Sequence, residues 1–195
     1  MMLLLRPKIE IETERLVLRL PKMRDYEQWA EVRRTGADFL LPWEPIRPRD
    51  YVGRKAFRNR VYWSSRAASD DRALPLFLLS KESGDFLGAA TLDNIRRGPA
   101  QTANLGYWIG PDYARQGYMS EAVRAVVAYA FSEMQLSRIE AACLDENAAS
   151  RRLLESCGFK YEGVAQAYLQ IGGRWRTHVL YANLRHDRRG RTEAL

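Results

Sequence analysis

The chain has 195 residues, of which 46% are hydrophobic and 28% charged, and its formal net charge is +7. This balance excludes an intrinsically disordered chain, and the length is enough to bury the core of one ordinary domain. The excess of Lys and Arg favours anionic partners, such as a phosphorylated cofactor, RNA or a ribosomal surface, although it also serves solubility.

The few cysteines and histidines limit the redox and metal chemistry of the chain. Cys143 and Cys157 are too few for a disulfide framework or a four-ligand zinc site, so we expect buried, inert thiols. His178 and His186 lie far apart without a carboxylate at suitable spacing, and we expect no metal. No apolar run approaches the ~20 residues of a membrane span, and the apolar residues 1–5 are too short for a signal peptide. These features favour a cytoplasmic protein.

Hydrophobic periodicity predicts the elements of the first part of the chain. A weakly alternating strand is followed by a turn and a helix, a loop fixed by two prolines, and a helix rich in Arg and aromatic residues. Three strands come next. The predicted ranges are strand Ile9–Leu20, helix Asp25–Arg34, loop Phe39–Pro45, helix Asp50–Ala68, and strands Leu74–Leu79, Phe86–Ile95 and Thr102–Ile109.

The clearest element is the helix Gly117–Met134, because its apolar residues keep helical spacing from Met119 onward. The elements after it are strand Arg138–Leu144, helix Asn147–Ser156, and strands Phe159–Ile171 and Trp175–Leu184, which form a hairpin around Gly172 and Gly173. We predict one mixed α/β domain over residues 1–195, with about seven strands, about four helices, a core at 13–184 and a flexible basic tail at 185–195.

A strand, a short loop and the long helix meet at residues 105–120. This order brings several free backbone N–H groups and the positive end of the helix dipole to one volume. Gly117 lets a ligand approach the backbone, and Arg115 adds a charge for a phosphate oxygen. Neither the dinucleotide nor the P-loop signature is present, so the segment predicts a phosphate site of another kind. The alternative is an ordinary strand–helix turn with a surface arginine.

A second candidate segment begins at Asn147. Its side chain caps the following helix, and the amide could also bind an amide-rich ligand arm. Ser150 lies one turn inside that helix, where most serines have no special role. With the helix stop at Cys157-Gly158-Phe159, this segment and the phosphate loop together favour a protein that uses acyl-coenzyme A.

Four motifs carry a resemblance to a known family. They are Leu-Gly-Tyr-Trp-Ile-Gly with Arg-Gln-Gly-Tyr-Met-Ser at 105–120, Asn-Ala-Ala-Ser…Cys-Gly-Phe at 147–159, the tail motif at 168–180, and Pro-Trp-Glu-Pro at 42–45. The chain resembles the GNAT superfamily of acetyl-CoA-dependent N-acetyltransferases, in particular its RimJ branch of ribosomal-protein-alanine N-acetyltransferases. The likeness runs from about Thr13 to Leu184. The tail and the Pro-Trp-Glu-Pro loop are its most specific parts.

The resemblance implies a mostly antiparallel, splayed sheet, with the pantetheine of acetyl-CoA between strands Thr102–Ile109 and Arg138–Leu144. Backbone groups of Trp108 and Ile109 would hold the pantetheine amides, Asn147 would reach the same arm, and Arg152 would approach the nucleotide phosphate. The loop residues implied at the pyrophosphate are Arg115, Gln116, Gly117, Tyr118, Met119 and Ser120.

The implied reaction is direct attack of a neutral amine on the thioester, which needs a base for the amine proton and an acid for the leaving thiolate. The chain departs from the family at several positions. Ala114 and Met119 alter the loop, although its backbone groups remain. Leu154 stands where many relatives have a tyrosine acid, and Ser150, which matches a hydroxyl in RimL-like relatives, becomes the candidate acid. Asn104 stands where many relatives have a glutamate base, and a neutral amide cannot take a proton.

The proton acceptor therefore stays open. Glu44 is one candidate because its loop lines the acceptor pocket in the family, and its alternative role is to cap a turn or pair with Arg47. Tyr107 and Tyr168 could relay a proton, although a buried tyrosine usually satisfies one hydrogen bond. A peptide α-amine has a pKa near ~8, so part of it is neutral at neutral pH and water could be the relay. The missing base favours an α-amine over lysine, whose pKa is ~10.4.

Three functions remain open from the sequence. The first is acetylation of the N-terminal α-amine of a protein, with a ribosomal protein as the implied acceptor. The second is acetylation of a small amine, such as an antibiotic, polyamine or amino acid. The third is a non-catalytic module that binds acyl-CoA or RNA; Asn104 favours it, whereas Ser150, Asn147 and the phosphate loop oppose it. We expect no membrane contact and no direct nucleic-acid binding, and exposed aromatics in the helix Asp50–Ala68 point to a homodimer.

Overall fold

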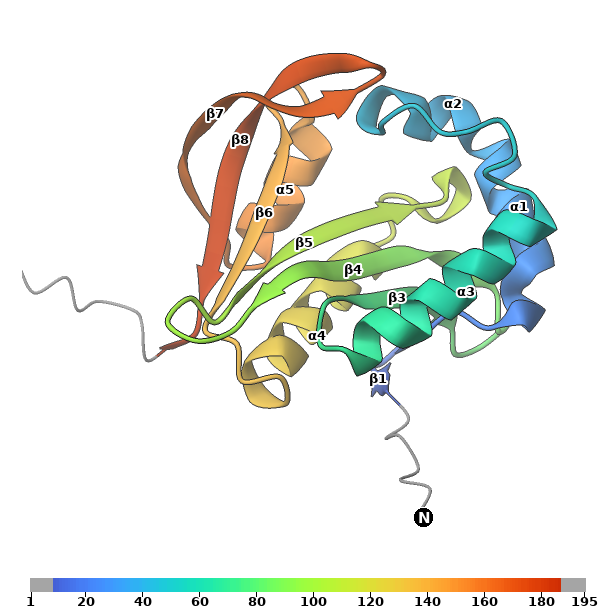
Figure 1. Ribbon diagram of the computed structural model, residues 1–195, viewed down its shortest axis with the longest axis horizontal. Helices are drawn as coiled ribbons and strands as arrows, with labels where there is room; N and C mark the ends of the chain where they lie inside the picture. Colours follow the sequence, from blue (N-terminus) through green and yellow to red (C-terminus); the bar gives the residue numbers. More distant parts are fainter. Residues whose placement is uncertain (1–8, 187–195) are drawn as a thin grey trace, which may run out of the picture.

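The computed structural model describes residues 9–186 and arranges them around one open sheet (Figure 1). Its strands are β1 (Glu10–Glu12), β2 (Leu16–Arg19), β3 (Leu74–Ser80), β4 (Phe86–Arg96), β5 (Thr102–Ile109), β6 (Arg138–Leu144), β7 (Lys160–Ile171) and β8 (Arg174–Leu184). Its α-helices are α1 (Tyr26–Thr35), α2 (Ala37–Leu40), α3 (Arg54–Ser69), α4 (Tyr118–Ser132) and α5 (Ala148–Ser156). The 3-10 turns are η1 (Met23–Asp25), η2 (Leu41–Trp43) and η3 (Pro111–Tyr113).

The strand order is β1-β2-β3-β4-β5-β6-β8-β7, and every pair is antiparallel except β5 with β6. These two strands are joined by α4, because a parallel neighbour needs a crossover connection. They pair only through Thr102–Asn104 and Arg138–Glu140, and beyond that point they diverge into a V (Figure 1). The predicted mixed α/β fold with a splayed, mostly antiparallel sheet is confirmed.

Helices cover the two faces of the sheet differently. On one face α4 and α5 lie over a large aliphatic core, which includes Val123, Val126 and Ile139, each fully buried. On the other face α1 and α3 cover only the β3–β4 part, through an aromatic cluster built on Trp29 and Phe57. Each such buried side chain contributes about 1.5–3 kcal/mol relative to exposure. The second face therefore stays open over the V.

The structure differs from the expected elements in two places. The strand predicted over Ile9–Leu20 is a hairpin of β1 and β2, because Thr13 closes a turn: its N–H donates to the Leu16 carbonyl at 3.0 Å and its Oγ1 accepts from the Leu16 N–H at 2.9 Å. The loop predicted at Phe39–Pro45 begins with the end of α2 and continues through η2. These two differences account for the eighth strand and the fifth α-helix among residues 9–186.

Other boundaries moved by a few residues. The helix expected from Asp50 begins at Arg54, because the segment before it forms turns closed by Tyr51 N–H to Pro48 O and Gly53 N–H to Asp50 O. The ranges of β5 and β6 agree with the prediction at both ends. Both cysteines are buried and unpaired, as expected. In the described part of the chain no helix is long and apolar enough to cross a bilayer. The flexible tail predicted at 185–195 falls outside the described residues from 187 onward.

Candidate active site

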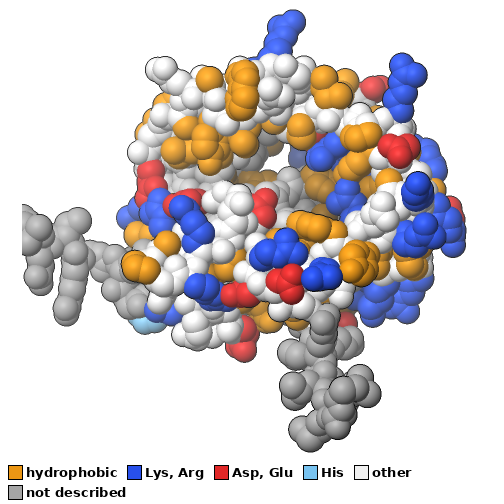
Figure 2. Space-filling model, viewed as in Figure 1, with side chains coloured by type: hydrophobic (Ala, Val, Ile, Leu, Met, Phe, Trp, Pro, Cys, Tyr) orange, Lys and Arg blue, Asp and Glu red, His pale blue; other side chains and the backbone are white. Residues whose placement is uncertain are grey.

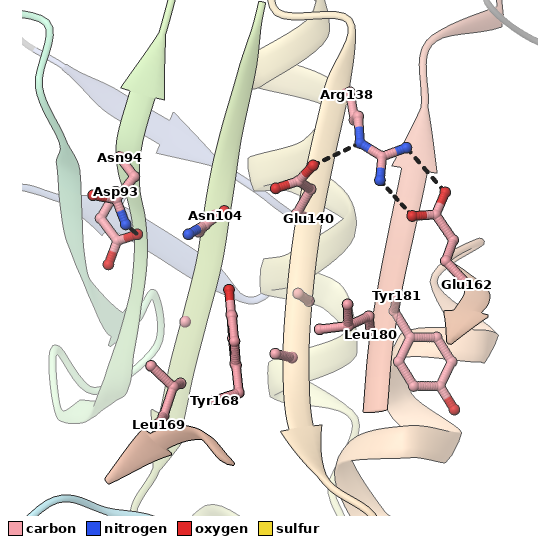
Figure 3. Close-up of a pocket in the computed structure, with 13 residues that line it drawn as sticks. Asp93, Asn94, Asn104, Arg138, Glu140, Glu162, Tyr168, Leu169, Leu180 and Tyr181 are labelled. Carbon is pink, nitrogen blue, oxygen red and sulfur yellow. Dashed lines mark hydrogen bonds and ion pairs between the residues drawn. The ribbon is translucent and has the colours of Figure 1, made fainter. Parts of the chain in front are cut away.

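A cavity of about 370 Å³ lies where β5 and β6 separate, and side chains from β4 to β8 line it (Figure 3). The space-filling view shows a hollow on the open face of the molecule, with apolar and basic side chains along its rim (Figure 2). The tip of the β7–β8 hairpin closes the rim, because Gly172 donates its N–H to the carbonyl of Glu44 at 3.0 Å. The hollow is therefore bordered by an early segment of the chain, at Glu44, and a late one, at Gly172.

Strand β5 gives this region two different halves. Successive side chains of a strand point to opposite faces of the sheet. Leu105 enters the core beneath α4, and Tyr107 packs against the same core. Trp108 lies on the other face, where its ring packs on Phe86 at 5.6 Å and the guanidinium of Arg33 lies 4.7 Å from its centre. The α4–α5 half and the open half of the site therefore share one strand.

On the α4–α5 half, Tyr107 meets Ser150. The phenol oxygen lies 2.7 Å from Ser150 Oγ, and Ser150 donates its N–H to Asn147 Oδ1 at 3.0 Å. Asn147 is thus the N-cap of α5, as predicted. Burial raises the pKa of Tyr107, and the hydrogen bond with Ser150 opposes this only in part. The phenol is consequently protonated at neutral pH, and the two hydroxyls form one chain that can pass a proton.

The loop before α4 has the backbone of an anion site. Arg115 and Gly117 have positive φ values of 63° and 83°, and Gly117 is the N-cap of α4. The exposed residues 115–117 leave the first N–H groups of a fifteen-residue helix facing outward. Ser120, another predicted loop contact, is half-buried within the first turn of that helix.

An arginine that sequence reasoning missed supports this loop. Arg15 donates to the carbonyl of Gln116 at 3.0 Å and to Glu121 at 2.7 Å, and its guanidinium lies 4.4 Å from the centre of the Tyr118 ring. Thr13 Oγ1 also donates to Glu121. Burial raises the pKa of Glu121, but the hydrogen bonds from Thr13 and Arg15 outweigh it and the net pKa is lowered. No local signal could have found Arg15, because about a hundred residues separate it from the loop.

Glu44, the sequence candidate for the proton acceptor, lies in an ion pair. Its two oxygens accept hydrogen bonds from Arg33 at 2.8 and 2.5 Å. Arg47, the ion-pair partner predicted as an alternative, has its Nε 3.7 Å from Glu44 Oε2. Arg33 is 7% exposed and stacks between Trp108 and Tyr51. The carboxylate therefore connects the end of η2 to Arg33 of α1 and, through it, to Trp108 of β5.

Three polar side chains form a row across the floor of the cavity. Asn104 on β5 is the register partner of Asp93 on β4 and of Glu140 on β6. Residues opposite one another in a ladder point to the same face, and Figure 3 shows all three around the cavity. Glu140 accepts from Arg138 at 2.8 Å and lies 3.5 Å from Arg96. The row therefore consists of the Asn104 amide, the Glu140 carboxylate with its two arginine partners, and the Asp93 carboxylate.

The other predicted residues lie around the same V. Ile109 ends β5 beside Trp108, and Arg152 is exposed on α5, one turn from Asn147. His178, in contrast, is 3% exposed, and its Nδ1 lies 2.9 Å from the Arg176 carbonyl, so its role is structural. Tyr168 lines the cavity and packs edge-on against His178 at 5.7 Å.

Residues 15–160 match the family model described as an acetyltransferase (GNAT) domain. The chain is 34% identical over 176 residues to the [ribosomal protein uS5]-alanine N-acetyltransferase of Escherichia coli, covering 90% of this chain and 91% of that protein. It superposes on a ribosomal-protein-S5-alanine acetyltransferase from Vibrio fischeri with a TM-score of 0.85, at 28% identity over 92% and 98% of the two chains. It also superposes on Mycobacterium smegmatis RimJ in complex with CoA-disulfide, with a TM-score of 0.84 and 30% identity over 90% and 84% of the chains.

Proposed function

The chain belongs to the GNAT family of acetyltransferases, which use acetyl-CoA, and from that premise we propose that it acetylates the N-terminal α-amine of a protein, by direct attack of the amine on the thioester. The choice of acceptor is supported by the 34% identity to a uS5-alanine N-acetyltransferase over nine tenths of the chain. The acceptor in this proposal is a ribosomal protein whose mature chain begins with alanine.

The free edge of β5 supports a pantetheine site. β5 pairs with β4 as far as Ile109, but among the described residues its pairing with β6 ends at Asn104. The backbone groups of residues 105–109 on the β6 side therefore have no strand partner and are available to hydrogen-bond a ligand. An extended chain with two amides, as in pantetheine, satisfies such an edge as an added strand would. Trp108 and Ile109 are the residues we assign to it.

The charged end of the cofactor suits the loop before α4. Its free N–H groups and the helix dipole favour the pyrophosphate of acetyl-CoA, and the exposed Arg115 adds a positive charge. The loop contacts of the proposal are Arg115, Gln116, Gly117, Tyr118, Met119 and Ser120, with Asn147 toward the pantetheine and Arg152 toward the nucleotide phosphate.

Ser150 and Tyr107 act as the acid in this proposal. The leaving thiolate needs a proton, and a hydroxyl pair linked at 2.7 Å on the α4–α5 half of the V supplies one. Glu44 takes a supporting part instead of accepting the amine proton, because Arg33 occupies both of its oxygens. It holds η2 against the hairpin tip and so shapes the wall that an acceptor peptide would meet.

Thiol release from acetyl-CoA tests the proposed acceptor. The acceptors are a peptide beginning with alanine, the same peptide with a blocked N-terminus and an internal lysine, and a panel of small amines. We expect release only with the free N-terminus, and a mass increase of one acetyl group on that peptide. Turnover of small amines alone would replace the proposal with a small-amine acetyltransferase, and binding of acetyl-CoA without any turnover would support a non-catalytic module.

A further inference from the structure

The acceptor half of the cavity lacks an assigned base, because Asn104 cannot take a proton. Its register partners are Asp93 and Glu140, so a carboxylate lies on each side of the amide. Directly opposite residues of an antiparallel pair have Cβ atoms about 4.5–5.5 Å apart. A carboxylate on β4 thus reaches the space that a longer acidic side chain on β5 would fill.

Only one of the cavity's carboxylates is free of guanidinium groups. Glu140 is bound by Arg138 and lies near Arg96, and Glu162 is bound by Arg138 through both oxygens. The hydrogen bonds from Arg138 lower the pKa of Glu162, which makes that carboxylate a poor proton acceptor. Both oxygens of Glu140 already contact guanidinium groups. Asp93 has no ion pair within residues 9–186, and it accepts a single hydrogen bond, from the Asn94 side-chain amide at 3.2 Å.

We infer that Asp93 is the general base of this site, taking the proton from the acceptor amine on the open face of β5. The inference rests on the proposed acetyl transfer, but not on the class of amine. It places base and acid on opposite faces of one strand, since Asp93 shares the face of Asn104 and Gly106, whereas Tyr107 and Ser150 lie on the α4–α5 side. The amine therefore enters from one side, and the thiolate is protonated from the other.

The backbone around Asp93 is consistent with a site of this kind. Regular pairing between β4 and β5 is interrupted just after it, and Asn94 adopts a positive φ of 48°. A bulge of this type bends the strand and redirects the side chain beside it. Burial raises the pKa of the Asp93 carboxyl, which makes it a stronger base than an exposed aspartate.

The proton balance closes over the whole reaction. Asp93 takes one proton from the ammonium form of the acceptor, the freed nitrogen bonds to the thioester carbon, and the carbon–sulfur bond breaks. The thiolate receives a proton from the Tyr107–Ser150 pair. The second nitrogen proton, lost as the amide forms, replaces it through solvent, and Asp93 later releases its proton to water.

The variants Asp93→Asn and Asp93→Glu test the inference against Glu162→Gln, which removes another carboxylate of the same cavity. They are assayed with whichever amine the wild type acetylates. We expect Asp93→Asn to lower kcat about 100-fold near neutral pH with the KM for acetyl-CoA unchanged, because general bases contribute about 10²–10⁴. Asp93→Glu should recover part of the rate. Glu162→Gln should stay within about tenfold of wild type, because Arg138 binds both Glu162 oxygens and Glu162 takes no proton in this mechanism.

A pH profile separates a base from a structural role. The loss in Asp93→Asn should shrink as the pH rises through the pKa of the amine, about 8 for an α-amine, because the free amine then needs no base. The titratable and charged groups around Asp93 are Glu140, Arg138, Glu162, Tyr168, Arg96 and Arg72, and all remain in this variant. A loss independent of pH, or a rate near that of wild type, would overturn the inference.

The experiments distinguish a wrong acceptor from a wrong base. Wild-type turnover of small amines alone rejects the N-terminal acceptor, but the Asp93 comparison then runs on those amines. A wild type that acetylates no amine would overturn both proposals. A titration followed by ¹³C NMR of the carboxyl groups gives a readout besides activity. The Asp93 signal is the one missing from Asp93→Asn, and its pKa should lie above the ordinary value of about 3.9. A value at or below it would count against a base.

Discussion

The two halves of the V differ in how they are built. The α4–α5 half is built mainly from short contiguous segments, a loop and two helix starts, together with the hydroxyls of Tyr107 and Ser150. The open half consists of charged side chains from separate elements, such as the Arg33–Glu44 pair and the row through Asn104. In the proposed function the first half binds acetyl-CoA, which is the same in every reaction of the family. The second can change with the acceptor, because it depends on single side chains.

The largest expected effect concerns the hydroxyl pair of the α4–α5 half. Ser150→Ala and Tyr107→Phe should each lower kcat about 100-fold while the KM for acetyl-CoA changes little, because a positioned acid contributes about 10²–10⁴. The double variant should lose little more than either single one, since the two hydroxyls act as one chain. Steady-state kinetics of the three variants check this. Full activity of Ser150→Ala would remove the hydroxyl chain from the proposed mechanism.

On the open half, Glu44→Gln should mainly reduce stability. Arg33 is buried, and removing one partner of a buried ion pair costs about 3–5 kcal/mol. Chemical denaturation measures the difference. The control is Glu31→Gln, because Glu31 pairs with Arg34 at 3.6 Å with both side chains exposed, and such pairs contribute about 0–1 kcal/mol. Equal losses in the two variants would show that the Arg33–Glu44 pair does not hold the wall.

A smaller effect is expected at the phosphate loop. Gly117→Ala places a Cβ at φ +83° and 3.3 Å from Arg15 Nη2, and a side chain in the left-handed region costs about 1–2 kcal/mol. We expect the KM for acetyl-CoA to rise about tenfold with kcat little changed. Gly98→Ala is the matched control, because Gly98 also has a positive φ, +64°, and no neighbour within 4 Å. It should lose stability without any change in KM.

The smallest effect is the pH dependence of the Glu121 contacts. The folded state lowers the pKa of Glu121, so the group stabilises the fold above its ordinary pKa of about 4.3 and loses this contribution as the pH falls through the folded value. Glu121→Gln should therefore lower Tm slightly at neutral pH and by less in acid. Thermal melts across this range measure the difference. A Tm difference that grows as the pH falls would contradict the assignment.

Elements whose signals are local could be predicted from the amino-acid sequence alone. The helical spacing in α4, the cap at Asn147 and the glycine of the phosphate loop each depend on residues a few positions apart, and the family motifs add the splayed sheet and acetyl-CoA. Weak alternation could not reveal the turn at Thr13, because one hydroxyl and one N–H close it.

Which distant side chains meet depends on the folded arrangement of the whole chain. Tyr107 and Ser150 are 43 residues apart, Arg15 and Gln116 are 101 apart, and the partner of Glu44 is Arg33 on α1. The row through Asp93, Asn104 and Glu140 depends on strand register, in which a shift of one residue would turn every side chain to the other face. Register follows from the packing of the whole sheet. The charged side chains around the proposed acceptor are therefore set by the fold, whereas most of the segments that we assign to the cofactor can be recognised in the sequence.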